Sequence, residues 1–344
     1  MPNADAIDPK ALTSDPVLLA PHYVLGEHRR MAADIEGLST FFEASQMIDD
    51  LALWGLDRFH STDQAAASLG IDSGRETLRL AGVRTEDVSA LLICATQLEG
   101  DTEAHAALVR RYLEGLGLDH DIFVAGITLG RCTCLLSGLR LAESLVRSNM
   151  HNNVLVIAAD RFEHDHERLK SFALFSDGAA SCIVSRPDSG NGGYRILDSA
   201  YASQIDAMAE TGQISADLTR RVTARLTARL PLAIEDVKAL MHSNIYTPVV
   251  AMKEQQGGFA RSQLCFENIA DKAHCFGADP IINLVDRERS GGIEAGDLLM
   301  LASSIPGARV GMLLSKRSEV ASESTLRAPF DAELLDDGRR AGTS

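Results

Sequence analysis

The chain has 344 residues, a net charge of −15, and 45% hydrophobic and 24% charged residues. This length allows two domains or one large duplicated α/β unit. The acidic balance argues against a nucleic-acid surface, which needs a basic face, and no apolar run approaches the roughly 20 residues that span a bilayer. Since residues 1–20 lack the basic start and apolar core of a signal peptide, we expect a cytoplasmic protein.

The first half predicts alternating helices and strands. Residues 1–35 carry few signals and are expected to wrap the surface. Helical periodicity and continuous apolar runs then predict a helix at 61–80 that ends at Gly82, a buried strand at 88–96, a helix at 104–118, and strands at 153–160 and 180–184.

The second half repeats this order. The pattern predicts a strand at 237–243, a helix that follows 272–277 and runs through 280–285, and strands at 297–303 and 309–314. A polar, turn-rich stretch at 187–193 separates the halves. We therefore predict a duplicated α/β layered fold with its site where the halves meet, divided into 1–190, 191–316 and a charged tail, 317–344, expected to be mobile.

The stretch 123–138 is the strongest candidate for chemistry. An apolar run ends in Gly130, and Cys132 then opens a segment with helical periodicity. Unpaired backbone N–H groups and the helix dipole at such a position favour the thiolate. The alternative is an inert, buried cysteine. The six cysteines should be reduced in the cytoplasm, and the spacing of Cys132 and Cys134 does not make a zinc site.

A basic helix is predicted at 218–230, inside an otherwise acidic chain. It contains Arg220, Arg221, Arg225 and Arg229. Such a charge run is most often a solvated helix face. The functional interpretation is a docking site for the phosphates of coenzyme A or for an acidic carrier protein.

The order of motifs around Cys132 resembles the β-ketoacyl-ACP synthase III family. The helix end at Ser148, the strand Leu155-Val156-Ile157 and the turn Phe175-Ser176-Asp177-Gly178-Ala179 follow Cys132 in the family's register. The resemblance covers roughly residues 45–316 and is strongest over 88–185. It implies a thiolase-like duplicated α-β-α-β-α layered fold, a homodimer, and Cys132 as the acylated nucleophile in preference to Cys134, with Cys94 and Cys182 as packing residues.

The family's other two catalytic groups are a histidine and an asparagine. His242, with Asn244 two residues on, stands where the family has Pro-His-Gln-Ala-Asn, although the proline is missing. The family's asparagine position is occupied by His274, and Asp279 follows five residues later. The arrangement resembles a divergent branch of the family with a His-x4-Asp pair, so Cys132, His274 and Asp279 are a candidate acyl-transfer triad.

Three alternatives stay open for these residues. His274 is a core or surface histidine in the first. Asp279 is a helix N-cap ahead of Pro280 in the second. In the third, Cys132 acts with His242 and His274 in a Cys-His-His site that still decarboxylates malonyl groups.

Recognition of the acyl donor is carried over from the family. The resemblance places Trp54 and Arg58 near the adenine of coenzyme A, Arg168 near a second arginine position, and Gly307 in the family's glycine-rich loop, with residues 196–230 shaping the pockets. It implies no permanently bound cofactor and no metal. A coenzyme A or phosphopantetheine thioester is then the substrate.

These observations predict an acyltransferase of a specialised, polyketide-type pathway. Cys132 would take an acyl group from acyl-CoA or acyl-ACP and pass it to a small-molecule or carrier-bound acceptor, without nucleic-acid or membrane partners. One alternative is decarboxylative condensation with malonyl-ACP, which primes a chain. Another, motivated by Pro306 and the missing asparagine, is a catalytically silent thiolase-fold partner subunit.

Overall fold

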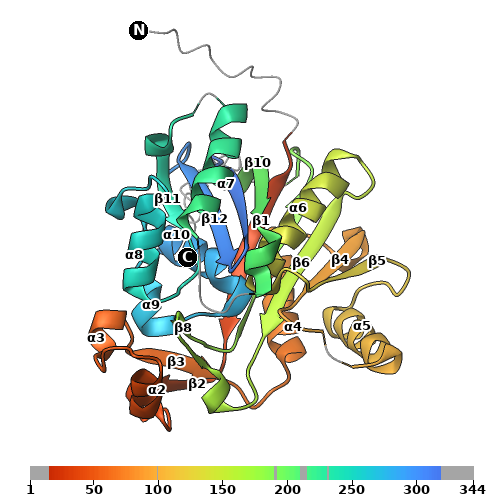
Figure 1. The fold of residues 1–344 in the computed structure, drawn as a ribbon. Helices are drawn as coiled ribbons and strands as arrows, with labels where there is room; N and C mark the ends of the chain where they lie inside the picture. Colours follow the sequence, from red (N-terminus) through yellow and green to blue (C-terminus); the bar gives the residue numbers. More distant parts are fainter. Residues whose placement is uncertain (1–14, 99, 190–191, 210–214, 231, 319–344) are drawn as a thin grey trace, which may run out of the picture.

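The computed structural model describes residues 15–98, 100–189, 192–209, 215–230 and 232–318. Its main feature is a nine-stranded mixed sheet in the order β11-β12-β13-β10-β1-β9-β6-β4-β5 (Figure 1). No helix in these ranges is both long and apolar enough to span a membrane.

Five strands of this sheet come from the first half of the chain. They are β1 (Val17–Leu25), β4 (Ala90–Cys94), β5 (Phe123–Ile127), β6 (Asn153–Asp160) and β9 (Gly178–Ser185). The second half contributes β10 (Tyr194–Ser203), β11 (Val237–Met241), β12 (Leu298–Ile305) and β13 (Ala308–Lys316). Each apolar run predicted as a strand overlaps one of these elements: 153–160, 180–184 and 309–314 lie within β6, β9 and β13, whereas 88–96, 237–243 and 297–303 extend beyond β4, β11 and β12.

The two halves have the same topology. In the first, β1 is antiparallel to β9, β9 is antiparallel to β6, and β4 runs parallel to β6. In the second, β10, β13, β12 and β11 repeat these three relations in the same order. A single parallel bridge from Leu240 to Leu264 stands where β4 pairs with β5 in the first half. The predicted duplication is therefore visible in the strand pairing.

Helices form three layers around the two halves of the sheet. In the first half α4 (Ala66–Ala81) packs on the strands and α5 (Thr102–Leu116) packs on α4, and in the second α7 (Ala216–Arg229) packs on the strands and α8 (Thr247–Gln256) packs on α7. The central pair, α6 (Cys134–Arg147) and α10 (Asp279–Arg289), contacts strands of both halves. This arrangement is the predicted α-β-α-β-α layering.

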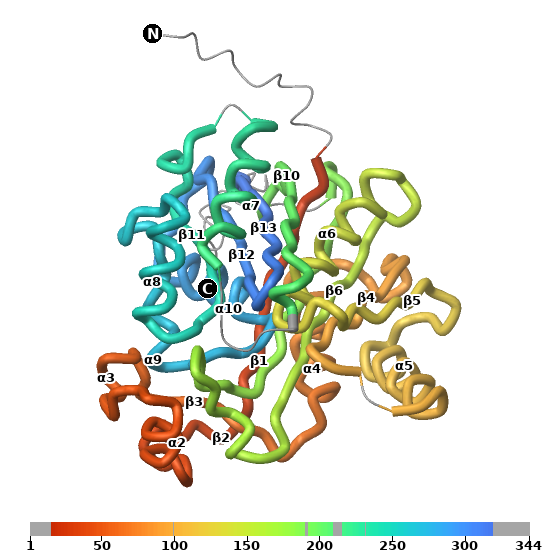
Figure 2. The backbone as a smooth tube through the Cα atoms, viewed as in Figure 1, coloured from red at the N-terminus to blue at the C-terminus, as the bar shows by residue number. Residues whose placement is uncertain are grey.

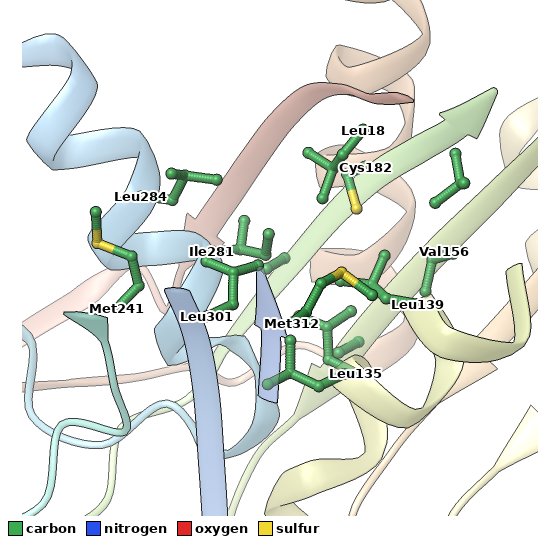
Figure 3. Packing of buried hydrophobic residues seen from close by; sticks show 14 of the residues in the cluster. Leu18, Leu135, Leu139, Val156, Cys182, Met241, Ile281, Leu284, Leu301 and Met312 are labelled. Atoms are coloured by element: carbon green, nitrogen blue, oxygen red, sulfur yellow. The ribbon is translucent and has the colours of Figure 1, made fainter. Parts of the chain in front are cut away.

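The central layer forms the largest apolar core. Leu135 and Leu139 of α6 pack in one cluster with Ile281 of α10 and with Leu301 and Met312 of the second half (Figure 3). Side chains around most of the circumference of α6 are buried, because sheet lies on both sides of it.

The smaller elements lie toward one end of the molecule. They are β2 (His28–Met31), α2 (Leu38–Ala44), α3 (Leu51–Trp54), β3 (Arg58–Ser61), β7 (Leu169–Lys170), β8 (Ala173–Leu174) and α9 (Glu267–Lys272). The predicted helix 61–80 begins later than expected, at Ala66, because residues 58–61 pair with β2. Gly82 ends it in the left-handed conformation, as predicted.

The prediction that residues 1–35 wrap the surface was wrong for residues 17–25, and residues 1–14 lie outside the described ranges. Residues 17–25 form β1, which lies between β9 and β10 in the middle of the sheet (Figure 2). The strand is irregular: its register with β9 shifts between Leu19 and His22, and Ala20 has a φ of 46°. This bulge, together with Pro21, interrupts the apolar pattern and hides the strand in the sequence.

Two predicted boundaries fall on undescribed residues. The division at 190/191 lies outside the described ranges, as do residues 319–344 of the expected tail. The last strand, β13, ends at Lys316.

Candidate active site

Cys132 lies in a short turn between β5 and α6. Residues Arg131–Thr133 form a 3-10 turn, and the α-helix begins only at Cys134, two residues later than the sequence suggested. The Ser303 hydroxyl of β12 donates a hydrogen bond of 2.8 Å to the backbone carbonyl of Cys132. A residue of the second half thus fixes the turn that carries the predicted nucleophile.

His274 lies in the equivalent turn of the second half, ahead of α10. Its backbone N–H bonds to Leu174 O, and its carbonyl accepts from the Ser176 N–H. Its ring packs 4.5 Å from the ring of Phe175, and the side chain is fully buried. Backbone contacts on both sides therefore hold the imidazole in place.

Asp279 orients His274. One carboxylate oxygen, Oδ2, accepts hydrogen bonds from His274 Nδ1 and from the Asn244 N–H, the latter at 2.6 Å. The other oxygen accepts from the Cys275 N–H at 2.7 Å. Asp279 is the first residue of α10 and makes no N-cap hydrogen bond, so the N-cap alternative is wrong. The carboxylate instead ties His274 to two loops.

Backbone strain gathers beside these residues. Arg131 precedes Cys132 with a φ of 45°, and Ala273 and Phe276 bracket the His274–Cys275 pair with φ values of 53° and 51°. Such left-handed conformations are unfavourable for side chains larger than glycine and cluster at functional sites. The two turns also touch: a Cβ on Gly277 would lie 2.9 Å from Cys134 Sγ.

Burial and charge shift the pKa values of His274 and Cys134. Burial lowers the pKa of His274, but Asp279 and Cys132 outweigh it and raise this pKa to about 10. Burial raises the pKa of the Cys134 thiol well above its ordinary value. Since Cys134 is fully buried under α6, its thiol stays protonated and away from solvent.

Cys132 and His274 open into one cavity of about 310 Å³. Its wall is mainly apolar, and four aromatic rings contribute: Phe162, Phe172, Phe175 and Phe276. A nucleophile, a histidine held by a carboxylate and an apolar chamber together can form and hold a covalent acyl group. Sequence reasoning missed Ser303 and this aromatic wall, which carry no local signal.

A second, polar chamber of about 490 Å³ adjoins the first. Thr96, Phe162, Lys170 and Phe276 line both chambers. Asp160, at the end of β6, lines only the second, and burial raises its pKa to about 7. The sequence shows a strand ending in Asp160, but gives no indication that the carboxyl group faces a chamber beside His274.

His242 is not oriented toward Cys132. Its Nε2 accepts a hydrogen bond of 3.1 Å from the Cys265 N–H, and its Nδ1 lies 2.9 Å from Ser243 O. Both ring nitrogens are therefore occupied by the backbone, and burial lowers the pKa of the ring. Asn244 is buried behind Asp279, where its Oδ1 accepts from Asn283. Neither side chain lines the Cys132 cavity, and their predicted roles at the substrate stay predictions.

Arg168 is a structural residue. It is fully buried, and its guanidinium makes two hydrogen bonds, of 2.6 and 2.8 Å, to the Asp177 carboxylate. Asp177 also accepts from the backbone N–H groups of Thr62 and Phe162. The side chain is enclosed by its own chain, and its predicted contact with coenzyme A stays a prediction.

Trp54 and Arg58 are partly exposed and do not line the cavity. The Trp54 indole donates to Ile48 O and packs 5.5 Å from the ring of Tyr246. Arg58 forms an ion pair of 3.4 Å with Asp271. Both side chains have intramolecular partners, and their predicted roles toward the donor stay predictions.

The arginines of α7 bond to neighbouring strands and loops. Arg220, Arg221 and Arg225 donate to the carbonyls of Gln256, Ser203 and Tyr201, and Arg229 pairs with Asp198 at 3.1 Å. Gly307 lies at the tip of the β12–β13 hairpin with a φ of 73°, where a Cβ would lie 2.5 Å from Met208 N. Glycine is therefore required for the hairpin to approach residues 204–208, and Pro306 beside it lines the cavity.

One group of possible metal ligands occurs in the described ranges. It consists of Glu27, His28 and Asp63, which are all exposed. This group contains no cysteine, and none of its three residues lines the Cys132 cavity.

The comparisons with known proteins agree with the resemblance at Cys132. The family model for 3-oxoacyl-[acyl-carrier-protein] synthase III matches residues 128–204. The β-ketoacyl-[acyl-carrier-protein] synthase III of Fusobacterium nucleatum is 29% identical over 170 residues, 46% of this chain and 49% of that protein. The enzyme of the same name from Caldanaerobacter subterraneus is 22% identical over 301 residues, 77% of this chain and 89% of that protein.

Solved structures agree with the fold. OleA of Xanthomonas campestris with acetamide bound has a TM-score of 0.74 at 15% identity, covering 88% of this chain and 99% of its own. ChlB3, described as an acyltransferase, has a TM-score of 0.76 at 16% identity, covering 89% of this chain and 98% of its own. The chain therefore has the thiolase-like fold that its sequence predicted, and its resemblance to β-ketoacyl-ACP synthase III is confirmed.

Proposed function

We propose that this chain, which resembles β-ketoacyl-ACP synthase III, is an acyltransferase that carries the acyl group on Cys132. The observation that carries the proposal is the His274–Asp279 pair facing the same cavity as Cys132. The family's asparagine would only donate a hydrogen bond there, whereas a histidine held by a carboxylate accepts and returns protons.

The first step is acylation of Cys132. With its raised pKa, His274 holds a proton beside the sulfur at neutral pH. The Cys132 thiolate attacks the thioester carbonyl, and backbone N–H groups at the start of the helix stabilise the oxyanion. The C–S bond of the donor then breaks, and the departing thiolate takes the proton of His274.

The second step is transfer to the acceptor. Cys132 raises the pKa of His274, and this contribution disappears once the sulfur is acylated. His274 has also given its proton to the departing thiolate, so its neutral ring accepts the proton of an acceptor hydroxyl or amine that attacks the thioester. Collapse of the tetrahedral intermediate returns the Cys132 thiolate, and Asp279 stabilises the imidazolium.

The geometry favours transfer over decarboxylative condensation. Decarboxylation needs donors on the malonyl thioester oxygen, and the histidine expected to supply one, His242, uses both nitrogens on the backbone. The description of ChlB3 as an acyltransferase supports the same choice. The assembled triad argues against a catalytically silent partner subunit.

The proposal extends to the reaction partners. The donor is an acyl-CoA or acyl-ACP, and the acceptor is a small molecule or a carrier-bound group of a specialised, polyketide-type pathway. The protein acts as a cytoplasmic homodimer. The exposed parts of Arg220 and Arg229 on α7 would meet the acidic carrier or the coenzyme A phosphates.

Intact-mass spectrometry tests the proposal. The full-length chain is incubated with a panel of acyl thioesters, and we expect one acyl group on the wild type and on Cys134→Ala, but none on Cys132→Ala. Label on Cys132→Ala that is lost in Cys134→Ala would identify the other thiol as the nucleophile. Release of carbon dioxide and a β-ketoacyl product from acyl-enzyme and malonyl-ACP would overturn the non-decarboxylative assignment.

A further inference from the structure

The acyl cavity contains cations but no carboxylate. Arg131 and Lys170 line it together with Cys132 and His274, and none of its lining residues is aspartate or glutamate. The adjoining chamber is lined by three carboxyl residues, Asp160, Glu163 and Glu167, and by two cations, Arg161 and Lys170. Of the two chambers, the acyl cavity is therefore the one whose charged lining residues are all cations.

Arg131 is the cation closest in the chain to the nucleophile. Its NH2 group donates a hydrogen bond of 3.1 Å to the backbone carbonyl of Met208, which anchors one side of the guanidinium. Within the described ranges no carboxylate lies within 4.0 Å of it. A guanidinium has five donors, so most of its hydrogen-bonding capacity is open.

The conformation of Arg131 is unusual for its side chain. With a φ of 45° it occupies a position where glycine or asparagine would be unstrained. Arginine at such a position adds backbone strain without improving the core. A cost of this kind is typical of residues kept for a function.

A buried cationic cluster lies behind the cavity wall. Ser304 lines the cavity, and its hydroxyl accepts a hydrogen bond of 2.8 Å from Arg309. Arg309 and Lys253 share one carboxylate, that of Glu254, and all three side chains are fully buried. Glu254 balances the charge of Arg309, and burial lowers the pKa of Lys253, so the cluster places at most one positive charge behind the cavity wall.

We propose that the acyl group held on Cys132 carries its own carboxylate, and that Arg131 binds this carboxylate. The inference rests on the proposed function and names its substrate class: acyl thioesters of dicarboxylic acids. The phosphates of the donor are excluded as the partner, because they lie at the far end of the pantetheine arm from the thioester. A neutral aliphatic chain would leave the partly buried Arg131 guanidinium without a counter-charge in the cavity, which is unfavourable.

Matched pairs of coenzyme A thioesters test this assignment. Succinyl and 4-methylpentanoyl groups have the same shape, since two methyl groups replace the two carboxylate oxygens, and glutaryl and 5-methylhexanoyl form a second pair. The rate of Cys132 acylation is measured by intact mass. We expect at least one of the two dicarboxylic thioesters to acylate Cys132 tenfold or more faster than its uncharged isostere. The same rate preference should persist with N-acetylcysteamine thioesters, which lack phosphates.

Variants locate the charge recognition. Arg131→Met should slow the dicarboxylic donor tenfold or more and leave its isostere within about twofold, while Arg131→Lys keeps part of the preference. Arg161→Met, which alters a cation in the adjoining chamber only, should leave the ratio unchanged.

The outcomes separate this inference from the proposed function. If the wild-type protein reacts at equal rates with the two members of each thioester pair, the dicarboxylic inference is overturned and the proposed function is not. This result does not depend on whether Arg131→Met folds. A preference that disappears with N-acetylcysteamine, or that Arg161→Met removes, also overturns it. Absence of label on Cys132 with every thioester overturns both proposals.

Discussion

The protonation of His274 connects the catalytic pair to stability. Its pKa in the folded state is about 10, above the ordinary value of 6.5, because Asp279 and Cys132 outweigh the effect of burial. The folded protein thus binds this proton more tightly than the unfolded chain. The resulting stabilisation is fully present below pH 6.5 and is lost as the pH rises through about 10.

We therefore expect the stability difference between the wild type and His274→Asn to shrink from pH 6.5 to pH 10, as measured by urea denaturation. His242→Asn is a control for which the stability difference should depend on pH in the opposite direction. Burial lowers the pKa of His242, so the stabilisation by neutral His242 is lost as the pH falls below 6.5. A His274→Asn difference that is constant over the alkaline range would contradict the ion-pair assignment.

Arg168 forms a buried ion pair with Asp177 that should stabilise the fold. Its two short hydrogen bonds to Asp177 are fully enclosed. Removing one partner of a buried pair costs about 3–5 kcal/mol, so Arg168→Ala should lose that much free energy of unfolding in guanidinium titrations. Arg168→Lys keeps the charge but not the two-pronged geometry and should lose less.

The same variants test the donor-binding role that the family resemblance suggested. Arg168→Lys should bind the acyl-CoA donor as the wild type does, with KM within about twofold to threefold. A tenfold increase in KM without loss of stability would show that the side chain reaches the donor after all.

At the scale of elements, the cluster on α8 and β13 fixes the hairpin that closes the cavity. Glu254 neutralises one of two buried cations, and despite burial Arg309 and Lys253 lower its pKa from 4.5 to about 2. Glu254→Gln leaves Lys253 and Arg309 facing each other without a carboxylate. We expect a loss of about 3–5 kcal/mol at neutral pH, measured by chemical denaturation.

The pH dependence of this loss is a further test. Because the folded pKa of Glu254 is depressed, its stabilisation is present above pH 4.5 and is lost as the pH falls through about 2. The gap between wild type and Glu254→Gln should therefore narrow over this interval. Glu76→Gln, which breaks an exposed pair with Arg79, should change stability little at any pH.

Elements with uninterrupted apolar runs could be predicted from the sequence, and irregular ones could not. β6 matches its predicted bounds. Every residue from Val154 to Asp160 is buried, so the strand appears in the sequence as a continuous apolar run rather than as an alternation of apolar and polar residues. β1 was missed because its bulge at Ala20 breaks the pattern. Cys132, His274 and Asp279 were proposed as site residues from the order of the family's motifs, because this order can be read directly along the sequence.

The remainder of the site depends on contacts that are distant in the chain. Ser303 meets Cys132 across 171 positions, and Arg131 acquires its significance only from a cavity wall built by other elements. Nothing in a local window distinguishes such residues from packing residues. In the same way, Arg168 matched a position expected from the family, but no local pattern indicated Asp177 as its partner.

For the whole molecule, the duplication explains why the site is shared. Each half places a turn before its central helix: Cys132 precedes α6 and His274 precedes α10. The two helices lie in one layer and share one apolar cluster, so the turns meet at Gly277. The proposed nucleophile and its proposed base are therefore aligned only when both halves are packed against the central layer.

This sharing predicts that the halves unfold together. Leu139 lies on α6 in the first half, is fully buried, and packs in the cluster that contains Leu301 and Met312 of the second half (Figure 3). Leu139→Ala should cost about 2–5 kcal/mol through lost burial and the cavity left behind. In a molecule with a common core, amide exchange in β12 and β13 should then accelerate to the same extent as in β4 and β6. Hydrogen exchange measured by mass spectrometry tests this prediction. If β12 and β13 keep their wild-type protection in Leu139→Ala, the two halves are independently stable. The alignment of Cys132 with His274 would then have another origin.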